Sequence, residues 1–184
     1  MHVTVASCFS FFDGISVDEV VARSHMLHAH KVDLSTAPNA LDNPSPFPAD
    51  DVAVFNEGRW TVVWQDNGYP DQFADAIAAS PKVSRAVIVF WNVNADQEFS
   101  YWENGDRVVR FDWPDDRTGT DPNRLLTAMT DTVLKPRATD EGDTAIPDYR
   151  RLLALADRVT RIHLGPDFLN RVAVVMGHLS EDDN

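Results

Sequence analysis

Apolar and polar positions alternate most clearly over residues 84–113, where they predict three consecutive strands joined by tight turns. Residues 86–91 form an unbroken apolar run, which is typical of a strand that is buried on both faces. Asn104-Gly105 follows further on. It is a strong hairpin signal, because a type I′ turn requires positive φ at both central residues. The pattern therefore predicts an antiparallel meander around which the rest of the chain packs.

The segment before this meander begins with a predicted strand and a predicted helix. Residues 3–12 have the composition of a strand, with apolar residues on one parity. Ser16 and Glu19 have the spacing of a capping box, so we expect a helix that begins after Ser16 and ends near His30.

A proline-rich stretch separates this helix from the next strands. Residues 34–51 contain Pro38, Pro44, Pro46 and Pro48, and this spacing predicts a long loop. Residues 52–55 and 60–65 then predict a strand pair, and a short helix is expected before Pro81.

The last third of the chain is predicted to be mainly helical. Asp121 followed by Pro122 is typical of a helix start. We expect a single domain over residues 1–184, made of a sheet-centred core (1–134), an acidic linker (135–146) and C-terminal helices packed on the core (147–178). The predicted architecture is α+β, with a largely antiparallel sheet of about five or six strands, helices on one side and a C-terminal helical segment.

Composition narrows the classes of function. With 43% hydrophobic residues, the 184-residue chain is expected to be globular. The net charge is −13, and residues 1–145 carry 23 acidic and 11 basic side chains. Phosphate contacts require a basic face, so we expect no nucleic-acid partner, whereas a basic protein partner fits this charge.

The cysteine count and the pattern of apolar residues predict the cellular compartment. Cys8 is the only cysteine, so no disulfide can form within the chain. The first residues lack the pattern of a signal peptide, and no apolar run approaches the roughly 20 residues that span a bilayer. We expect a cytoplasmic protein that does not contact a membrane.

Short stretches along the chain together form a recognisable pattern. They are Phe9-Ser10-Phe11, Gly14-Ile15-Ser16, Trp60-Thr61-Val62, Asn67-Gly68-Tyr69, Ser84-Arg85-Ala86-Val87, Asn92-Val93-Asn94-Ala95, Phe99-Ser100-Tyr101, Asn104-Gly105 and Gly119-Thr120-Asp121-Pro122. Over about residues 5–130 the chain resembles an uncharacterised actinobacterial family, known only as a domain of unknown function. The resemblance implies an actinobacterial source and no established activity.

Histidines form the one motif with metal-ligand spacing. His25, His28 and His30 would converge on a metal such as zinc if the helix ended between them. The alternative, which we favour, is a helix C-terminus, where histidines interact well with the helix dipole. The sequence therefore predicts no metal and no cofactor.

Catalytic signatures do not stand out in the sequence. Cys8 lies in an aromatic strand, which favours a buried structural thiol over a nucleophile. No nucleophile elbow and no phosphate-binding glycine motif occurs. Several carboxylates lie near predicted strand ends, and we interpret them as solvated residues at the edges of the sheet. They are Asp66, Asp96, Glu98, Glu103 and Asp112. We assign no catalytic residue, and enzymatic activity is not expected.

The favoured hypothesis is a non-enzymatic protein-binding module. Trp and Tyr are enriched in binding hot spots, and Trp102 or Trp113 would supply an exposed anchor. The negative charge beside it would come from Asp112, Asp115, Asp116 and Asp121. An immunity-like or inhibitory role toward a basic partner is one version of this hypothesis.

Two other hypotheses remain open at this point. The first is a small-molecule- or metal-binding enzyme with a site between sheet and helices, closed by the proline loop at residues 34–51. The second is a homo-oligomeric scaffold, such as a homodimer, because paired sheets often form symmetric dimers.

Overall fold

A computed structural model describes residues 6–24, 26–33, 51–66, 72–94, 96–132, 134, 149–163 and 173–178. The strands are β1 (Ala6–Asp13), β2 (Leu27–Asp33), β3 (Asp51–Glu57), β4 (Trp60–Asp66), β5 (Arg85–Asn92), β6 (Gln97–Glu103), β7 (Asp106–Phe111) and β8 (Ala173–His178). The helices are α1 (Val17–Arg23), α2 (Gln72–Ala78), α3 (Leu126–Asp131) and α4 (Tyr149–Thr160).

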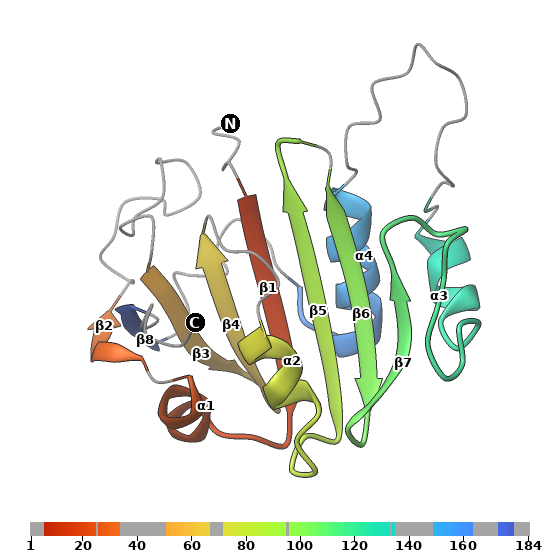
Figure 1. The fold of residues 1–184 in the computed structure, drawn as a ribbon. Helices are drawn as coiled ribbons and strands as arrows, with labels where there is room; N and C mark the ends of the chain where they lie inside the picture. The colour runs from red at the N-terminus through yellow and green to blue at the C-terminus, as the bar shows by residue number, and fades with distance from the viewer. Residues whose placement is uncertain are drawn as a thin grey trace.

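In the described residues, the strands form one eight-stranded sheet in the order β2-β8-β3-β4-β1-β5-β6-β7 (Figure 1). Every neighbouring pair is antiparallel. The predicted α+β fold with a largely antiparallel sheet is therefore confirmed, with more strands than the five or six expected.

The two additional strands lie where helices were expected. Helix α1 ends at Arg23, where the Ser24 backbone N–H donates to the Val20 carbonyl at 2.9 Å, and the next residues form β2. Residues 173–178, expected in the C-terminal helices, form β8 between β2 and β3. The partners of β8 lie more than 100 residues away in sequence, so no local pattern signals the pairing.

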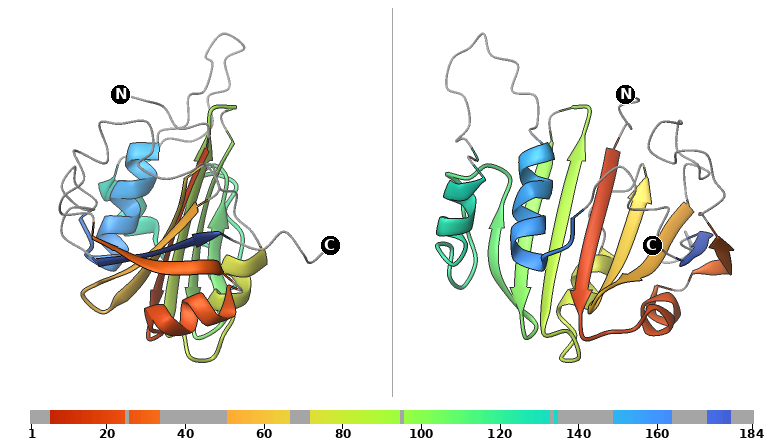
Figure 2. Two further views of the ribbon diagram at one scale, coloured as in Figure 1. Left: turned by 90° about the vertical axis from the view of Figure 1, so that its left-hand side faces the viewer. Right: turned by 180° about the vertical axis from the view of Figure 1, so that it is seen from behind.

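Helices cover both faces of the sheet, not one side as predicted. The sheet seen edge-on has α3 and α4 on one side and α1 and α2 on the other (Figure 2). Two separate clusters of buried side chains correspond to these two faces. The cause lies in the central strands, since seven of the eight residues of β5 are buried and point alternately to opposite faces. A sheet that is apolar on both faces requires cover on both.

Two predicted local signals are confirmed. The Glu19 backbone N–H donates to the Ser16 side-chain oxygen at 3.2 Å, so Ser16 caps α1. The turn between β6 and β7 has φ values of 53° at Asn104 and 88° at Gly105, as a type I′ hairpin requires.

The predicted helix start at Asp121 is wrong, because α3 begins five residues later at Leu126. The Asp121 backbone N–H instead donates to the Val108 carbonyl at 3.1 Å. Nearby, Thr118 and Arg110 exchange two backbone hydrogen bonds of 2.8 and 2.9 Å. The stretch before α3 thus covers the outer edge of β7, and an edge strand covered in this way does not pair with other chains.

The lower end of β1 carries a buried carboxylate. The Asp13 side chain is 3% exposed, and it accepts hydrogen bonds from Arg59 Nε at 2.7 Å and Arg85 Nη2 at 2.9 Å. The Arg85 guanidinium also lies 5.0 Å from the centre of the Trp60 ring. Burial alone would raise the pKa of Asp13, but the hydrogen bonds from the two arginines outweigh it and lower that pKa.

Apart from Asp51, the predicted proline loop lies outside the described residues, and so does the predicted linker at 135–146. None of the helices in the described part of the chain combines the length and apolar content needed to cross a bilayer.

We expect Gly119→Ala to destabilise the fold by about 2 kcal/mol or more. Gly119 has a φ of +119°, and a Cβ at this position would lie 2.2 Å from the Val108 carbonyl oxygen. Gly58→Ala is the matched control, because Gly58 also has positive φ (+59°) but has no atom within 4 Å of an added Cβ. Urea denaturation compares the two variants. If both variants lost the same unfolding free energy, the close approach of Gly119 to the Val108 carbonyl oxygen on β7 would be contradicted.

We expect Asp13→Asn to lower the unfolding free energy at neutral pH by about 2 kcal/mol, the range for hydrogen bonds to a charged group. The pKa of Asp13 is lower in the folded state. Its contribution is therefore complete above the unfolded pKa of about 3.9 and is lost as pH falls through the folded pKa. Urea denaturation from neutral pH to about pH 2 should show the difference from wild type shrinking. If the difference in unfolding free energy between Asp13→Asn and wild type stayed constant with pH, this role of Asp13 would be contradicted. Asp18→Asn is the control, because Asp18 is exposed on α1.

Candidate functional site: an acidic corner

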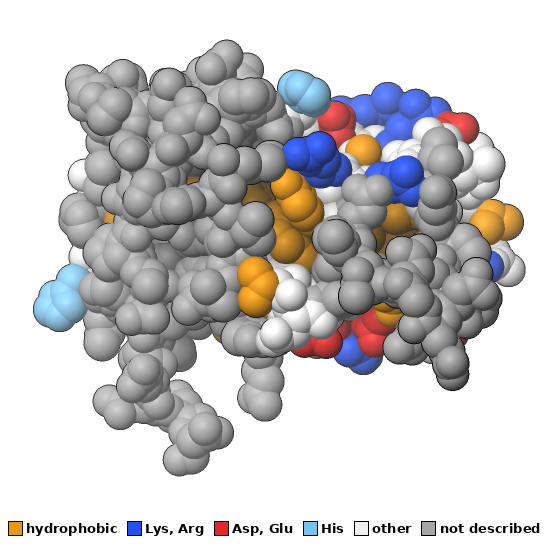
Figure 3. Space-filling model, turned by 90° about the horizontal axis from the view of Figure 1, so that it is seen from above, with side chains coloured by type: hydrophobic (Ala, Val, Ile, Leu, Met, Phe, Trp, Pro, Cys, Tyr) orange, Lys and Arg blue, Asp and Glu red, His pale blue; other side chains and the backbone are white. Residues whose placement is uncertain are grey.

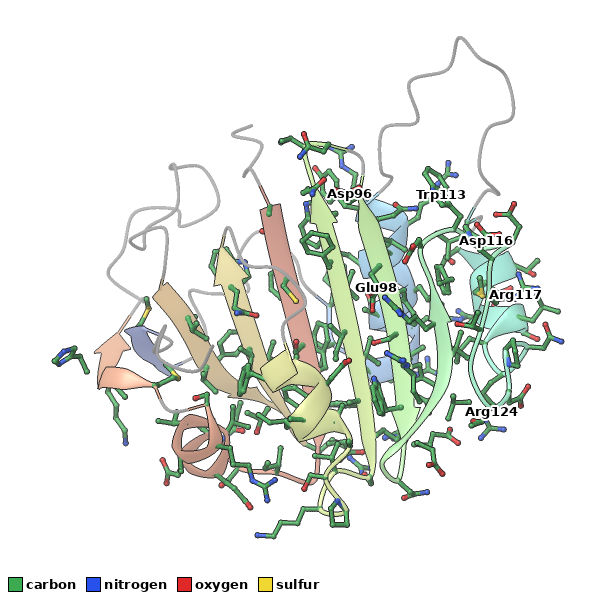
Figure 4. All side chains as sticks on the ribbon, viewed as in Figure 1. Asp96, Glu98, Trp113, Asp116, Arg117 and Arg124 are labelled. Carbon is green, nitrogen blue, oxygen red and sulfur yellow. The ribbon has the colours of Figure 1, made fainter. Side chains whose placement is uncertain are left out.

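Carboxylates gather where the β5–β6 turn meets the end of β7. We call the set Asp96, Glu98, Asp112, Asp115 and Asp116 the acidic corner. The Gln97 side-chain amide donates to the Asp112 carbonyl at 2.7 Å and joins the start of β6 to the end of β7. Figure 4 shows Asp96, Trp113 and Asp116 along this upper end of the sheet.

Neighbouring carboxylates of the corner act on the pKa of Asp112. The pKa of Asp112 is raised, first by partial burial and then by the negative charge of Glu98. Arg110 opposes this effect, while Asp116 and Asp96 add to it. The part of this rise that comes from Glu98, Asp116 and Asp96 reflects negative potential at Asp112, where a cation from another molecule would be stabilised.

Two arginines within reach of the corner already have partners. Arg110 Nη2 lies 2.8 Å from Glu98 Oε2 and forms an ion pair across β6 and β7. Arg117 donates to the Pro114 carbonyl and, at 3.4 Å, to Asn123 Oδ1, which shapes the loop after β7. These contacts leave the corner with more carboxylates than cations.

An Asn side chain shapes the β5–β6 turn. Asn92 Oδ1 accepts hydrogen bonds from the backbone N–H groups of Asn94 at 2.9 Å and Asp96 at 3.0 Å. Asn92 Nδ2 also donates to Asp96 Oδ2 at 2.8 Å. The turn therefore holds Asp96 in place and presents Val93, which is 53% exposed.

Apolar side chains lie beside the carboxylates of the acidic corner. Trp113 is half-buried and stands in sequence between Asp112 and the acidic pair Asp115-Asp116. Exposed Val93 lies on the turn that carries Asp96. The corner thus places apolar side chains beside several carboxylates.

Four of the six predicted binding residues are near neighbours in sequence and lie on the loop that follows β7, namely Asp112, Trp113, Asp115 and Asp116. Trp102 does not belong to this surface, since it is 8% exposed and packs on the face that α2 covers. Arg107 lies 5.3 Å over its ring. Asp121 is exposed beside Val108, further along β7.

The sequence placed Asp96, Glu98 and Asp112 among carboxylates near strand ends and did not predict that Asp96 joins the other two. Their proximity depends on the pairing of β6 with β7, and the hairpin signal at Asn104-Gly105 is the one feature of the sequence that predicts it. Glu103, at the opposite end of β6, is engaged elsewhere. It accepts a 2.6 Å hydrogen bond from the Tyr101 hydroxyl and pairs with Arg124 at 3.1 Å.

The predicted histidine cluster is not placed as expected. His25 and the His30 side chain lie outside the described residues, while His28 is exposed on β2 with a φ of 56° and not on a helix face. Among the residues that the structure describes, no three His, Cys, Asp or Glu side chains form a group that could hold a metal. Cys8 is buried, as predicted for a structural thiol.

The described structure defines an α+β protein with an antiparallel sheet covered on both faces and an acidic corner at one end. The chain belongs to the "Family of unknown function (DUF6461)", whose model matches residues 2–183. This match confirms the resemblance to a domain of unknown function and extends it beyond residues 5–130. No curated protein and no solved structure matches the chain.

We expect Glu98→Gln to lower the pKa of Asp112 toward its ordinary value of about 3.8, because it removes the largest charge that opposes ionisation of Asp112. Asp121→Asn is the control, since Asp121 lies further along β7, where its backbone N–H donates to the Val108 carbonyl. Carboxyl chemical shifts measured by NMR across a pH series report the pKa directly. An unchanged Asp112 pKa in Glu98→Gln would show that the two carboxylates are not electrostatically coupled.

Proposed function

We propose that the protein is a non-enzymatic binding module that recognises a basic protein through its acidic corner. An immunity-like or inhibitory role, in which the corner covers a functional basic surface of an effector, is the specific form that we propose. The partner would supply Lys or Arg side chains to Asp112 and Asp116 and an apolar contact to Trp113.

The gathering of carboxylates around Asp112, whose pKa is raised first by partial burial and then by repulsion from Glu98, carries this proposal. Asp112, exposed and with a raised pKa, stands among Glu98, Asp116 and Asp96. A guanidinium or ammonium group placed there relieves this repulsion, so its binding is favoured beyond a single ion pair. Half-buried Trp113 adds an apolar contact of the kind found at hot spots.

The charge of the whole chain supports the same kind of partner. A net charge of −13 attracts basic proteins over a distance and raises their rate of association at low salt. Because this attraction is screened over about 8 Å at physiological ionic strength, it favours encounter more than it stabilises the final complex.

The resemblance noted above leads us to propose an actinobacterial source. We also propose that the protein acts in the cytoplasm, where a single buried thiol such as Cys8 stays reduced. The first test therefore uses an actinobacterial lysate.

We expect the wild-type protein, immobilised at moderate salt, to retain one enriched basic protein from that lysate. The triple variant Asp112→Lys, Asp115→Lys, Asp116→Lys should lose it, with affinity for the purified partner falling at least about tenfold. Mass spectrometry identifies the retained protein, and titration calorimetry measures its affinity.

The matched control carries the same change in charge elsewhere, as Asp18→Lys, Glu57→Lys, Asp106→Lys. We expect it to retain the same basic protein, because none of these residues lies in the acidic corner. If both triple variants lose the partner equally, overall charge governs binding and the corner is not the site. If the wild type retains no basic protein, the proposed function is wrong.

A further inference from the structure

Two arginines converge on one carboxylate at the end of the sheet opposite the acidic corner. Asp13 ends β1, Arg85 begins β5, and Arg59 lies in the turn between β3 and β4. Arg59 Nε donates to Asp13 Oδ1 at 2.7 Å, while Arg85 Nε and Nη2 donate to Asp13 Oδ2 at 3.2 and 2.9 Å. We call Arg59 and Arg85 the arginine pair. Figure 3 looks onto the other end of the molecule, where basic and acidic side chains both reach the surface.

Asp13 engages only part of the hydrogen-bonding capacity of the arginine pair. A guanidinium carries N–H donors on each of its nitrogens. Toward the described residues, both Nη groups of Arg59 and Nη1 of Arg85 donate no hydrogen bond. The Arg59 and Arg85 side chains are 67% and 35% exposed, whereas that of Asp13 is 3% exposed. The pair can therefore donate to a second anion that arrives from solvent.

The position of the pair is fixed by groups that are themselves buried. Asp13 holds both guanidinium groups, and its backbone carbonyl accepts a hydrogen bond from the Ser84 N–H at 2.9 Å, next to Arg85. The Arg85 guanidinium also lies 5.0 Å from the centre of the Trp60 ring, which is buried. Because an arginine that is already held in place loses less conformational entropy on binding, this arrangement favours a ligand.

The local balance of charge favours an anion. Two guanidinium groups share one carboxylate, so this cluster keeps one positive charge. The next carboxylate, Glu103, lies opposite Arg85 in the β5–β6 register and is paired with Arg124 at 3.1 Å. Glu57 is not joined to the pair by any ion pair in the described part of the chain. The net charge of −13 repels anions at long range, but screening over about 8 Å at physiological ionic strength leaves direct contacts to decide binding.

We propose that the arginine pair binds the phosphate monoester group of a small ligand. Guanidinium forks match phosphate oxygens in geometry and bind them through charge-assisted hydrogen bonds. A phosphate monoester offers three terminal oxygens, which are enough to accept from both arginines, whereas one guanidinium already satisfies a carboxylate. Asp13 is a positioning residue, because it orients the two arginines and does not contact the ligand. The site is separate from the acidic corner and does not depend on it.

A matched pair of small anions tests the proposal on the intact protein. Methyl phosphate is mainly dianionic at about pH 7, since the second pKa of a monoester is about 6, whereas dimethyl phosphate carries one charge. At constant ionic strength, we expect methyl phosphate to shift the NMR signals of the Arg59 and Arg85 Nε–H groups along one saturable curve. Dimethyl phosphate and acetate should bind at least about fivefold more weakly. Absence of a saturable shift at the pair overturns the site. Equal binding of either monoanion overturns the assigned ligand class.

Single variants tie binding to the pair. Arg59→Gln removes one guanidinium and leaves Asp13 paired with Arg85, so methyl phosphate affinity should fall at least about tenfold. Arg59→Lys keeps the charge without the fork and should recover only part of that loss. Arg23→Gln is the matched control, because Arg23 is also partly exposed and pairs with one carboxylate, Glu19. Wild-type affinity in either Arg59 variant, or an equal loss in Arg23→Gln, overturns the proposal. Circular dichroism confirms that each variant is folded.

Discussion

Burial on both faces of the central strands is the constraint on which the rest of the structure depends. Phe11 and Phe12 are neighbours on β1, point to opposite faces, and are both fully buried. Complete burial of each such side chain contributes roughly 2 to 3 kcal/mol. Both faces must therefore be covered, and the helices are divided between them, with α1 and α2 on one face and α3 and α4 on the other.

Within the described strands, charged side chains consequently lie at strand ends or on the edge strands. At one end, the Asp13 carboxylate is satisfied by Arg59 and Arg85 and helps to fix the ends of β1 and β5. At the other end, the carboxylates of the acidic corner outnumber the cations near them. Of these two charged ends, the acidic corner has more carboxylates than cations and carries the half-buried Trp113, so we propose it as the functional surface and interpret Asp13 as a structural group.

Local signals predicted those features that depend on a few adjacent residues. The Ser16 cap, the Asn104-Gly105 turn and the apolar run of β5 all appear as the sequence indicates. Features that depend on distant pairing were not predicted. Strand β8 joins the sheet through β2 and β3, more than 100 residues away in sequence. Trp102 shows the same limit, since alternation gives the face of a residue but does not show that α2 covers that face.

Zero-length carbodiimide cross-linking in the cells that make the protein tests the central claim most directly, because it joins carboxylates to lysines in direct contact. Mass spectrometry then identifies which acidic residues are joined to another protein. If the acidic corner is the docking surface, cross-links to one partner will concentrate on Asp112, Asp115 and Asp116. Cross-links spread evenly over exposed acidic residues such as Asp18 and Asp106, or confined to them, would contradict the assignment of the corner.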